Sequence, residues 1–335
     1  MQIKNKILIV FFLFMLLVIN SCSGIKGKAV GRDGEILVVA DEELYDMFKP
    51  ALEDIFSDII NTPMEEKRFT LKRISIGKFK ENGHKFKNII MLCDVDSDTP
   101  ESDYIASIFT DDIKEGVRES EYYYVVKNDI WAKGQQILFL LDSDKMFLSQ
   151  YLEKYKDKMF GIFNDKLTAK VKSTLFDRFN NKDAQKLVKE KRGIDIFIPH
   201  DFVIINEGKD IDFIRFRRFH PDRWLTLIKG EYDENLSLED NIIVLRDAAG
   251  GEFGDSVRIN TELLTFKKDS TFAEGCVKAQ GLWEYTEGGG PFFTYGFVKK
   301  DMLYLVDGAV FVPQKEKYPY IIQLDLMART VKFSE

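Results

Sequence analysis

Residues 288–306 read GGGPFFTYGFVKKDMLYLV, and this stretch decides the fold of the second half of the chain. Two runs rich in aromatic and aliphatic residues, 292–298 and 302–306, flank the charged residues 299–301, which predicts a β-hairpin. Three glycines and Pro291 stand before the first run and predict a break in the chain. Outward from the hairpin, we expect strands at 194–199, 202–206, 212–219 and 224–229, and helices at 238–248 and 318–330.

Strands and helices alternate in the first half. Residues 34–40 predict a buried strand, and apolar residues at helical spacing predict a helix directly after it, which Pro50 should kink or split. Further strands are expected at 69–76, 87–93, 122–127 and 136–141, and a further helix at 103–116.

One long helical segment connects the two halves. Apolar residues three and four apart predict helix for nearly all of 145–191, interrupted at Asn180 and Asn181 and terminated by Gly193. The predicted fold class is therefore α+β, with mixed sheets, flanking helices and two α+β halves joined by this segment. The expected regions are a lipoprotein signal peptide at 1–21, a flexible tether at 22–33, an N-terminal α+β region with the helical segment at 34–192, and a C-terminal strand-rich α+β region at 193–335.

The first residues have the three regions of a secretory signal peptide. A basic start is followed by an apolar run at 7–19 and then by Ser21 and Cys22. As a helix the run rises roughly 20 Å, short of the ~30 Å hydrocarbon core, so a signal peptide fits better than a spanning helix. The small residue before the cysteine resembles a lipobox and predicts acylation of Cys22, with chains such as palmitate. The alternative is an ordinary signal peptide cut near Ser21 or Gly24.

Charge and anchoring disfavour nucleic acid as a partner. The formal net charge is −7 at pH 7, and loss of Lys4 and Lys6 with the signal peptide, without loss of any acid, would make it −9. An acidic, tethered protein binds nucleic acid poorly. The expected partners are the membrane, through the acyl chains, and an envelope protein. No acidic cluster follows Cys22, which favours the periplasmic face of the outer membrane.

The sequence contains no assembled catalytic or metal-binding motif. His84, His200 and His220 belong to no nucleophile or zinc motif, and phosphate loops and paired Cys-x-x-Cys are absent. Four aspartates between residues 94 and 103 partly match the spacing of a calcium-binding loop, but Thr99 stands where that loop needs glycine. We therefore expect no cofactor and no metal, and we favour a non-catalytic protein over an enzyme.

Cys93 and Cys276 remain after processing. An exported protein meets conditions that allow a disulfide. Sequence does not give the distance between the two Cα atoms, so a disulfide and two buried free thiols both stay open.

Five short phrases are left unexplained by periodicity: GEILVV at 34–39, WAKGQ at 131–135, RD at 246–247, GLWE at 281–284 and GGPF at 289–292. In this order they resemble a family of Bacteroidota envelope lipoproteins known only as a domain of unknown function (DUF4837-like). The match covers nearly all of the mature chain, with departures at Tyr45, at 62–64 and near Glu231. The resemblance implies an envelope location and a shared fold, and it brings no activity, cofactor or catalytic residue.

Three functions stay open. The first is a non-catalytic protein that binds or helps assemble an envelope protein. The second is a binding module for a glycan, peptide or lipid fragment, with a wall formed by Trp283, Tyr285, Phe292, Phe293 and Tyr295. The third is a hydrolase that uses carboxylates. The candidate ligand surface consists of Arg246, Asp247, Trp283, Glu284 and Phe292.

Replacing Cys22 by alanine should leave an uncleaved precursor without acyl chains, because the thiol is the group that is acylated before cleavage. Immunoblotting and mass spectrometry of membrane fractions measure both properties. Mature protein without acyl chains, made from the unmutated chain, would contradict the lipoprotein prediction.

Overall fold

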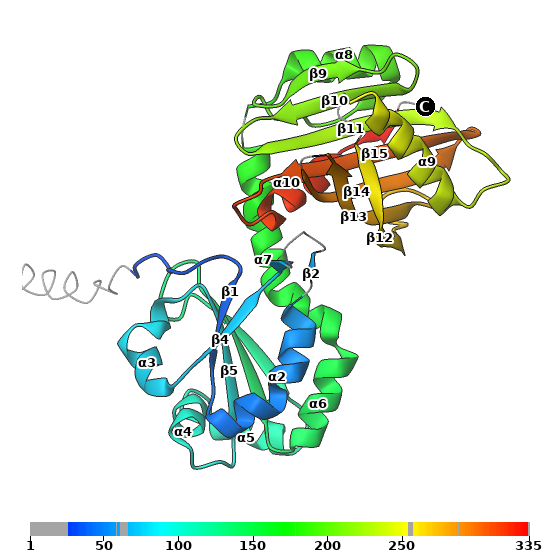
Figure 1. Cartoon of the computed structure of the whole chain (residues 1–335). Coiled ribbons are helices and arrows are strands. Elements are labelled where there is room, and N and C mark those ends of the chain that lie inside the picture. The colour runs from blue at the N-terminus through cyan, green and yellow to red at the C-terminus, as the bar shows by residue number, and fades with distance from the viewer. Residues whose placement is uncertain are drawn as a thin grey trace, which may run out of the picture. The chain divides into compact units, whose positions relative to one another are not determined.

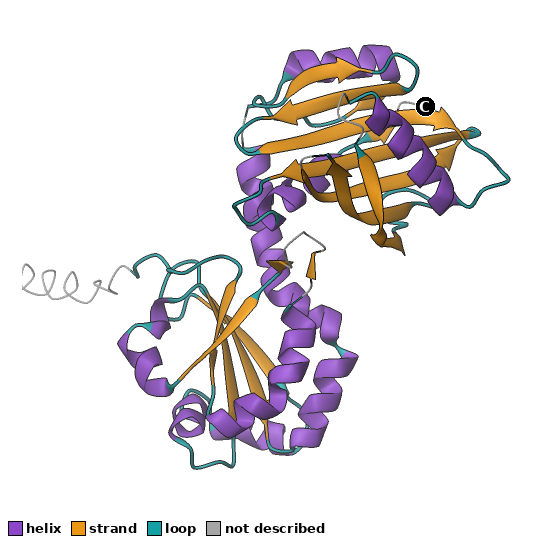
Figure 2. Cartoon of the chain, in the orientation of Figure 1, coloured by secondary structure: helices purple, strands orange, loops and turns teal. Residues whose placement is uncertain are grey.

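The computed structural model describes residues 26–57, 59–60, 66–177, 179–253, 257–286 and 288–333. Cys22, the predicted signal peptide and residues 62–64 lie outside the described residues. The chain forms two compact units: unit 1 contains residues up to Ile55 and Phe69–Met159, and unit 2 contains Phe56–Arg68 and Phe160–Glu335. Both units combine helices with sheet, so the α+β class is confirmed (Figure 1, Figure 2).

Unit 1 is built on a five-stranded sheet. Its strands are, in spatial order, β4 (Thr70–Ile74), β1 (Glu35–Val39), β5 (Asn88–Asp94), β7 (Gln136–Asp142) and β6 (Tyr124–Asn128). The first four are parallel, and β6 at the edge is antiparallel to β7. The central strands are continuous apolar runs, as expected for strands buried on both faces.

Helices cover both faces of this sheet. One face carries α3 (Ile76–Glu81), the 3-10 turn η1 (Gly83–Lys85), α4 (Pro100–Ala106) and α5 (Asp111–Arg118). The other face carries α2 (Glu42–Phe56) and α6 (Lys145–Lys154) (Figure 1). Unit 1 therefore has three layers, with the sheet in the middle.

The helix predicted at 103–116 is two helices, α4 and α5. Thr99 starts α4 early because its hydroxyl oxygen accepts a hydrogen bond from the Ser102 amide at 3.3 Å. Extended backbone at Thr110 then starts α5, whose first turn carries two aspartates that complement the helix dipole. Pro50, by contrast, does not split α2, which continues to Phe56.

The last residues of the predicted tether are bound to unit 1. The Ala29 amide donates to the Lys133 carbonyl at 2.9 Å, and the Val30 amide donates to the Lys85 carbonyl at 2.8 Å. These bonds bring the chain to the edge of the unit before β1 begins.

The long helical segment continues with α7 (Lys156–Phe176) and α8 (Lys182–Arg192). The predicted break is confirmed at Asn181, whose side-chain oxygen caps α8 by accepting from the Ala184 amide at 3.1 Å. Gly193 ends α8 with a φ of +65°, in the left-handed region that glycine adopts without strain.

Unit 2 is built on a seven-stranded antiparallel sheet. Its strands are, in spatial order, β12 (Arg258–Lys268), β13 (Val277–Tyr285), β14 (Gly288–Lys299), β15 (Met302–Phe311), β11 (Asp222–Glu231), β10 (Asp212–Arg218) and β9 (Val203–Glu207). The predicted hairpin is confirmed as β14 and β15 at the centre. Unit 2 also contains two short strand pairs: β8 (Ile194–Asp195) with β16 (Lys332–Phe333), and β2 (Ile59–Ile60) with β3 (Glu66–Lys67).

The two faces of this sheet are covered by different helices. α10 (Tyr318–Ala328) and α8 pack on one face, against side chains such as Phe293 and Tyr295. α9 (Leu238–Gly251) packs on the other face, against Ala279 and Leu305. We call these faces the α10 face and the α9 face.

The chain break predicted at 288–291 is wrong, because these residues form the start of β14. A Cβ atom on Gly290 would stand 2.0 Å from the Val310 carbonyl oxygen, and one on Gly289 would stand 2.3 Å from that of Trp283. The glycines thus allow neighbouring strands to approach closely, which is their other use besides turns.

Candidate functional site

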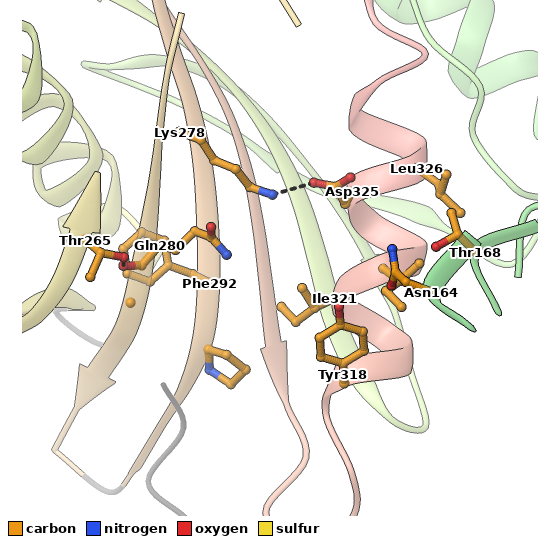
Figure 3. A pocket seen from close by; sticks show the side chains of 13 residues that line it. Asn164, Thr168, Thr265, Lys278, Gln280, Phe292, Tyr318, Ile321, Asp325 and Leu326 are labelled. Atoms are coloured by element: carbon orange, nitrogen blue, oxygen red, sulfur yellow. Dashed lines mark hydrogen bonds and ion pairs between the residues drawn. The ribbon is translucent and has the colours of Figure 1, made fainter. Parts of the chain in front are cut away.

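A cavity of about 450 Å³ lies on the α10 face of the unit 2 sheet. Side chains of β12, β13 and β14 form one wall, and α10 with the adjoining part of α7 forms the other (Figure 3). The volume is within the range of pockets that hold small ligands. The lining residues are Asn164, Thr168, Thr265, Lys278, Gln280, Gly281, Pro291, Phe292, Tyr318, Ile321, Ile322, Asp325 and Leu326.

Strand and helix periodicity explain why these side chains converge. Lys278 and Gln280 are two residues apart on β13, so both point to the α10 face, and Thr265 is the register partner of Gln280 on β12. On α10, Ile321 and Asp325 are four residues apart and therefore share one side of the helix.

One end of the cavity is closed by an ion pair between Lys278 and Asp325. The Lys278 Nζ to Asp325 Oδ1 distance is 2.8 Å, and the two side chains are 16% and 21% exposed (Figure 3). The Tyr295 hydroxyl donates to the same Oδ1 at 2.5 Å, and Arg329 Nε donates to Oδ2 at 3.0 Å. A largely buried carboxylate is thus satisfied by three donors.

Two groups of this cluster, Asp325 and Tyr295, have pKa values shifted away from neutral pH. Burial would raise the pKa of the Asp325 carboxyl, but the charges of Lys278 and Arg329 and the hydrogen bonds to it outweigh burial and lower that pKa. Burial, and then the charge of Asp325, raise the pKa of the Tyr295 hydroxyl far above its usual range. A catalytic acid or base works best with a pKa near the working pH, so neither group suits proton transfer.

The charges around the cluster balance. Arg329 Nη2 also donates to Asp269 Oδ2 at 2.7 Å and to the Tyr295 hydroxyl at 2.7 Å. Two cations, Lys278 and Arg329, therefore face two anions, Asp325 and Asp269. This wall of the cavity carries no uncompensated charge.

Two residues from the first half of the sequence hold the opposite end of the cavity. Glu66 Oε2 accepts from the backbone amides of Lys317 and Tyr318 at 2.7 and 3.3 Å, and Glu66 Oε1 pairs with Lys317 Nζ at 2.7 Å. Arg68 lies 3.7 Å over the Tyr318 ring and donates to Asn164 Oδ1 at 3.1 and 2.8 Å. Glu66 and Arg68 thereby fix the start of α10 and two lining side chains.

Of the five residues of the predicted ligand surface, Arg246 and Phe292 are brought together, but in the core. The Arg246 guanidinium lies 3.8 Å from the Phe292 ring centroid and donates to Asp307 Oδ1 at 2.6 Å. Both side chains are 2% exposed. They form a buried, hydrogen-bonded support for α9 and present no surface to a ligand there.

The other three predicted residues do not line this cavity; Trp283 and Glu284 line a separate hollow of about 550 Å³ at the end of β13. Asp247 is half-buried and accepts from the Ile259 amide at 2.9 Å, and burial raises its pKa. Glu284 is exposed and accepts from Asn260. Trp283 is 5% exposed and packs against the rings of Trp224, Tyr285 and Phe311.

The five aromatic residues predicted as one wall divide between the two faces. Trp283, Tyr285 and Phe292 belong to the cluster on the α9 face, whereas Phe293 and Tyr295 are fully buried on the α10 face. Alternation along a strand imposes this division. Of the five, only Phe292 is among the residues around the cavity, and its ring packs against Arg246 on the α9 face.

Sequence reasoning missed the residues that do line the cavity, chiefly Lys278, Gln280 and Asp325. Two signals existed. Polar residues alternate with small or apolar ones along β13, and Asp325 is the one acid within the otherwise apolar α10.

The described part of the chain contains no group of three or more His, Cys, Asp or Glu side chains placed to hold a metal ion. None of the three histidines lines the cavity. Cys93 and Cys276 are both buried free thiols, in unit 1 and unit 2 respectively, so they are not joined. Burial raises the pKa of each thiol to about 12.

The fold and the cavity define a two-unit α+β protein whose antiparallel unit contains a ligand-sized pocket. Residues 181–330 match the model of a domain of unknown function (DUF4837), and residues 29–176 match that of another domain of unknown function (DUF8532). The chain therefore contains two domains of unknown function. The DUF4837-like resemblance noted from sequence is confirmed for residues 181–330, whereas the first half matches a different domain model.

The crystal structure of LpqN, involved in cell envelope biogenesis of Mycobacterium tuberculosis, is similar at 10% identity over 47% of this chain and 99% of that chain, with a TM-score of 0.27. No curated protein matches the sequence. Among the described residues, no helix is long and apolar enough to cross a membrane.

Trp283→Ala should destabilise unit 2 by about 3–5 kcal/mol, because it removes a large buried ring and leaves a cavity. Urea denaturation measures the loss. Glu284→Ala is the matched control, since Glu284 is its exposed neighbour and the substitution should change stability by less than about 0.5 kcal/mol. Unchanged stability in Trp283→Ala would refute a packing role.

A second polar feature is the buried Asp142 at the end of β7. Asp142 and Asp94 are register partners on adjacent parallel strands. Asp142 is 2% exposed; its Oδ1 accepts from the Asp144 amide, and its Oδ2 has no partner among the described residues. Burial, and then the charge of Asp94, raise the pKa of Asp142 to about 6. The hydrogen bond from the Asp144 amide and the charge of Lys145 oppose this rise, and the charge of Asp144 adds a smaller increase.

The stability of unit 1 should therefore fall as the pH rises through about 6. The folded state binds this proton more tightly than the unfolded state, so the stabilisation is complete below about pH 4 and is lost above the folded pKa. Asp142→Asn should remove this dependence, which amounts to about 2–3 kcal/mol between pH 4 and pH 8. Amide hydrogen exchange in β5 and β7, corrected for intrinsic rates, measures it.

Glu153→Gln is the control for this experiment, because Glu153 is exposed on α6 and is not among the groups that shift the pKa of Asp142. It should leave the pH dependence in place. An identical pH profile in the unmutated chain and Asp142→Asn would refute the assignment.

Proposed function

We propose that this protein is an envelope lipoprotein, tethered through Cys22, that binds a small ligand in the α10 cavity of unit 2 and does not catalyse a reaction. The cavity is the observation that carries the proposal, because it combines a ligand-sized volume with converging polar groups. Binding without catalysis is supported by Tyr295 and Asp325 at its end, because the pKa of the hydroxyl is raised and that of the carboxyl is lowered, and neither group suits proton transfer near neutral pH.

The envelope part of the proposal rests on the sequence. The basic start, the short apolar run and the Ser21-Cys22 junction support export and acylation. We place the protein at the periplasmic face of the outer membrane because no acidic cluster follows Cys22. A ligand-binding unit held there by acyl chains would sample molecules released or carried within the envelope.

A second candidate is binding of an envelope protein at the α9 face. The rings of Trp224, Tyr285 and Phe311 are partly exposed there, and the Arg217 guanidinium lies 4.2 Å from the ring of the exposed Phe219. Tryptophan, tyrosine and arginine are the residues enriched in protein interfaces. Crosslinking in cells, with Cys22→Ala as the untethered control, tests this candidate by the recovery of one stoichiometric, tether-dependent protein.

Ligand binding should change the NMR signals of the methyl groups that line the cavity. The mature chain without its anchor, labelled at isoleucine and leucine methyls, would be screened by NMR against a library of small neutral, charged and apolar molecules. A ligand should shift the signals of Ile321, Ile322 and Leu326 in a saturable way and leave those of Ile90 and Leu138, in the core of unit 1, unchanged.

Thr168→Phe places a ring into the cavity and should abolish the response, whereas Thr168→Ser keeps the size of the site and should not. Circular dichroism would confirm that both variants fold. The proposed function would be contradicted if no member of the library shifts the methyl signals of the cavity. It would also be contradicted if the shifts persist in Thr168→Phe.

A further inference from the structure

The groups that line the cavity also restrict the chemistry of its ligand. Lys278 and Asp325 neutralise each other at 2.8 Å, and Arg329 and Asp269 neutralise each other at 2.7 Å beside them. A phosphate or carboxylate ligand would need a cation that is not already paired. The balanced wall therefore favours a neutral ligand.

Polar side chains in the cavity have hydrogen-bonding capacity left over. Within the described residues, the Gln280 side-chain amide has no protein partner, and Asn164 uses only its oxygen, which accepts from Arg68. Lys278 spends one of its three N–H donors on Asp325. These groups come from opposite walls of the cavity (Figure 3). An acyl chain between them would leave donors and acceptors unpaired, which is costly.

Apolar and flat surfaces complete the lining. Tyr318 stands at the end away from the ion pair, and Ile321 lies between Tyr318 and Asp325 (Figure 3). Pro291 also lines the cavity. Arg68 covers one side of the Tyr318 ring and holds it in place. The ligand therefore needs both hydroxyl-like groups and an apolar face, a combination that aromatic rings and side-chain amides recognise well.

The orientation of the sheet argues against an extended peptide. β13 lies between β12 and β14, with an irregularity in its pairing to β12 between Asn260 and Thr265, so the cavity meets the face of the sheet and not a free edge of β13. Peptide recognition by strand addition requires a free edge. Hydroxyl groups, by contrast, need only side-chain amides, since each hydroxyl both donates and accepts.

We propose that the ligand of the α10 cavity is a neutral saccharide of one or two rings, bound between Gln280 and Lys278 of the sheet and Asn164 and Tyr318 of the helices. This inference rests on the proposed function and narrows it to one ligand class. The cavity of about 450 Å³ accommodates a ligand of this size.

The test uses named probes on the methyl-labelled mature chain. N-acetylglucosamine, N,N′-diacetylchitobiose and cellobiose represent neutral saccharides, while trialanine, octanoate and inorganic phosphate represent the other classes. At least one saccharide should shift the methyl signals of Ile321, Ile322 and Leu326 with a saturable curve. Trialanine, octanoate and phosphate should leave them unchanged.

Gln280→Ala should weaken saccharide binding about tenfold, because one hydrogen-bonding amide of the site is lost. Gln280 is exposed and lies outside the core, so the variant should keep its fold. Gln323→Ala is the matched control, since Gln323 is on α10 but does not line the cavity, and it should bind as the unmutated chain does.

Two results would overturn the inference. If trialanine, octanoate or phosphate shifts the cavity methyls and no saccharide does, the ligand class is wrong while the proposed function stands. If saccharides bind but Gln280→Ala and Gln323→Ala behave alike, the polar wall does not recognise them. A failure of every probe and of the whole library would remove both proposals.

Discussion

The carboxylate of Asp325 is the point on which the organisation of unit 2 depends. It accepts from Lys278 on β13, from Tyr295 on β14 and from Arg329 just after α10. A largely buried carboxylate is stable only when its hydrogen-bond donors remain in place. Loss of one donor leaves part of the charge uncompensated. This requirement fixes α10 against two strands of the sheet and, in doing so, fixes the cavity between them.

The other end of α10 depends on residues distant in sequence. Glu66 accepts from the first amides of the helix, and Arg68 covers Tyr318 and holds Asn164. Both lie in the Phe56–Arg68 segment, which belongs to unit 2 although unit 1 surrounds it in the sequence. All the lining residues lie between Asn164 and Leu326, but two residues that hold this lining in place come from far earlier in the sequence.

The phrases that carry the family resemblance stabilise the fold and do not form the site. Gln135 donates its side-chain amide to the carbonyls of His84 and Phe86, Arg246 pairs with Asp307 in the core, and Trp283 is enclosed by other rings. Gly290 allows the close approach of β15. Among these phrases, Gly281, Pro291 and Phe292 reach the cavity lining, while its hydrogen-bonding side chains lie outside all five.

Sequence by itself determined the α+β class, the central hairpin of β14 and β15, and the ends of α8 at Asn181 and Gly193. These features depend on local patterns: alternation along a strand, helical spacing, capping and the conformational freedom of glycine. Residues 288–291 show the limit of such local patterns. Their glycines and proline are typical of a turn, but they lie within β14, where the glycines allow close strand packing.

Only the tertiary structure decided which residues form the cavity. Lys278 and Asp325 are 47 residues apart, and Glu66 and Lys317 are 251 residues apart. Their pairing arises from sheet register and helix docking, and the energy of a buried charge depends on neighbours that no local pattern specifies.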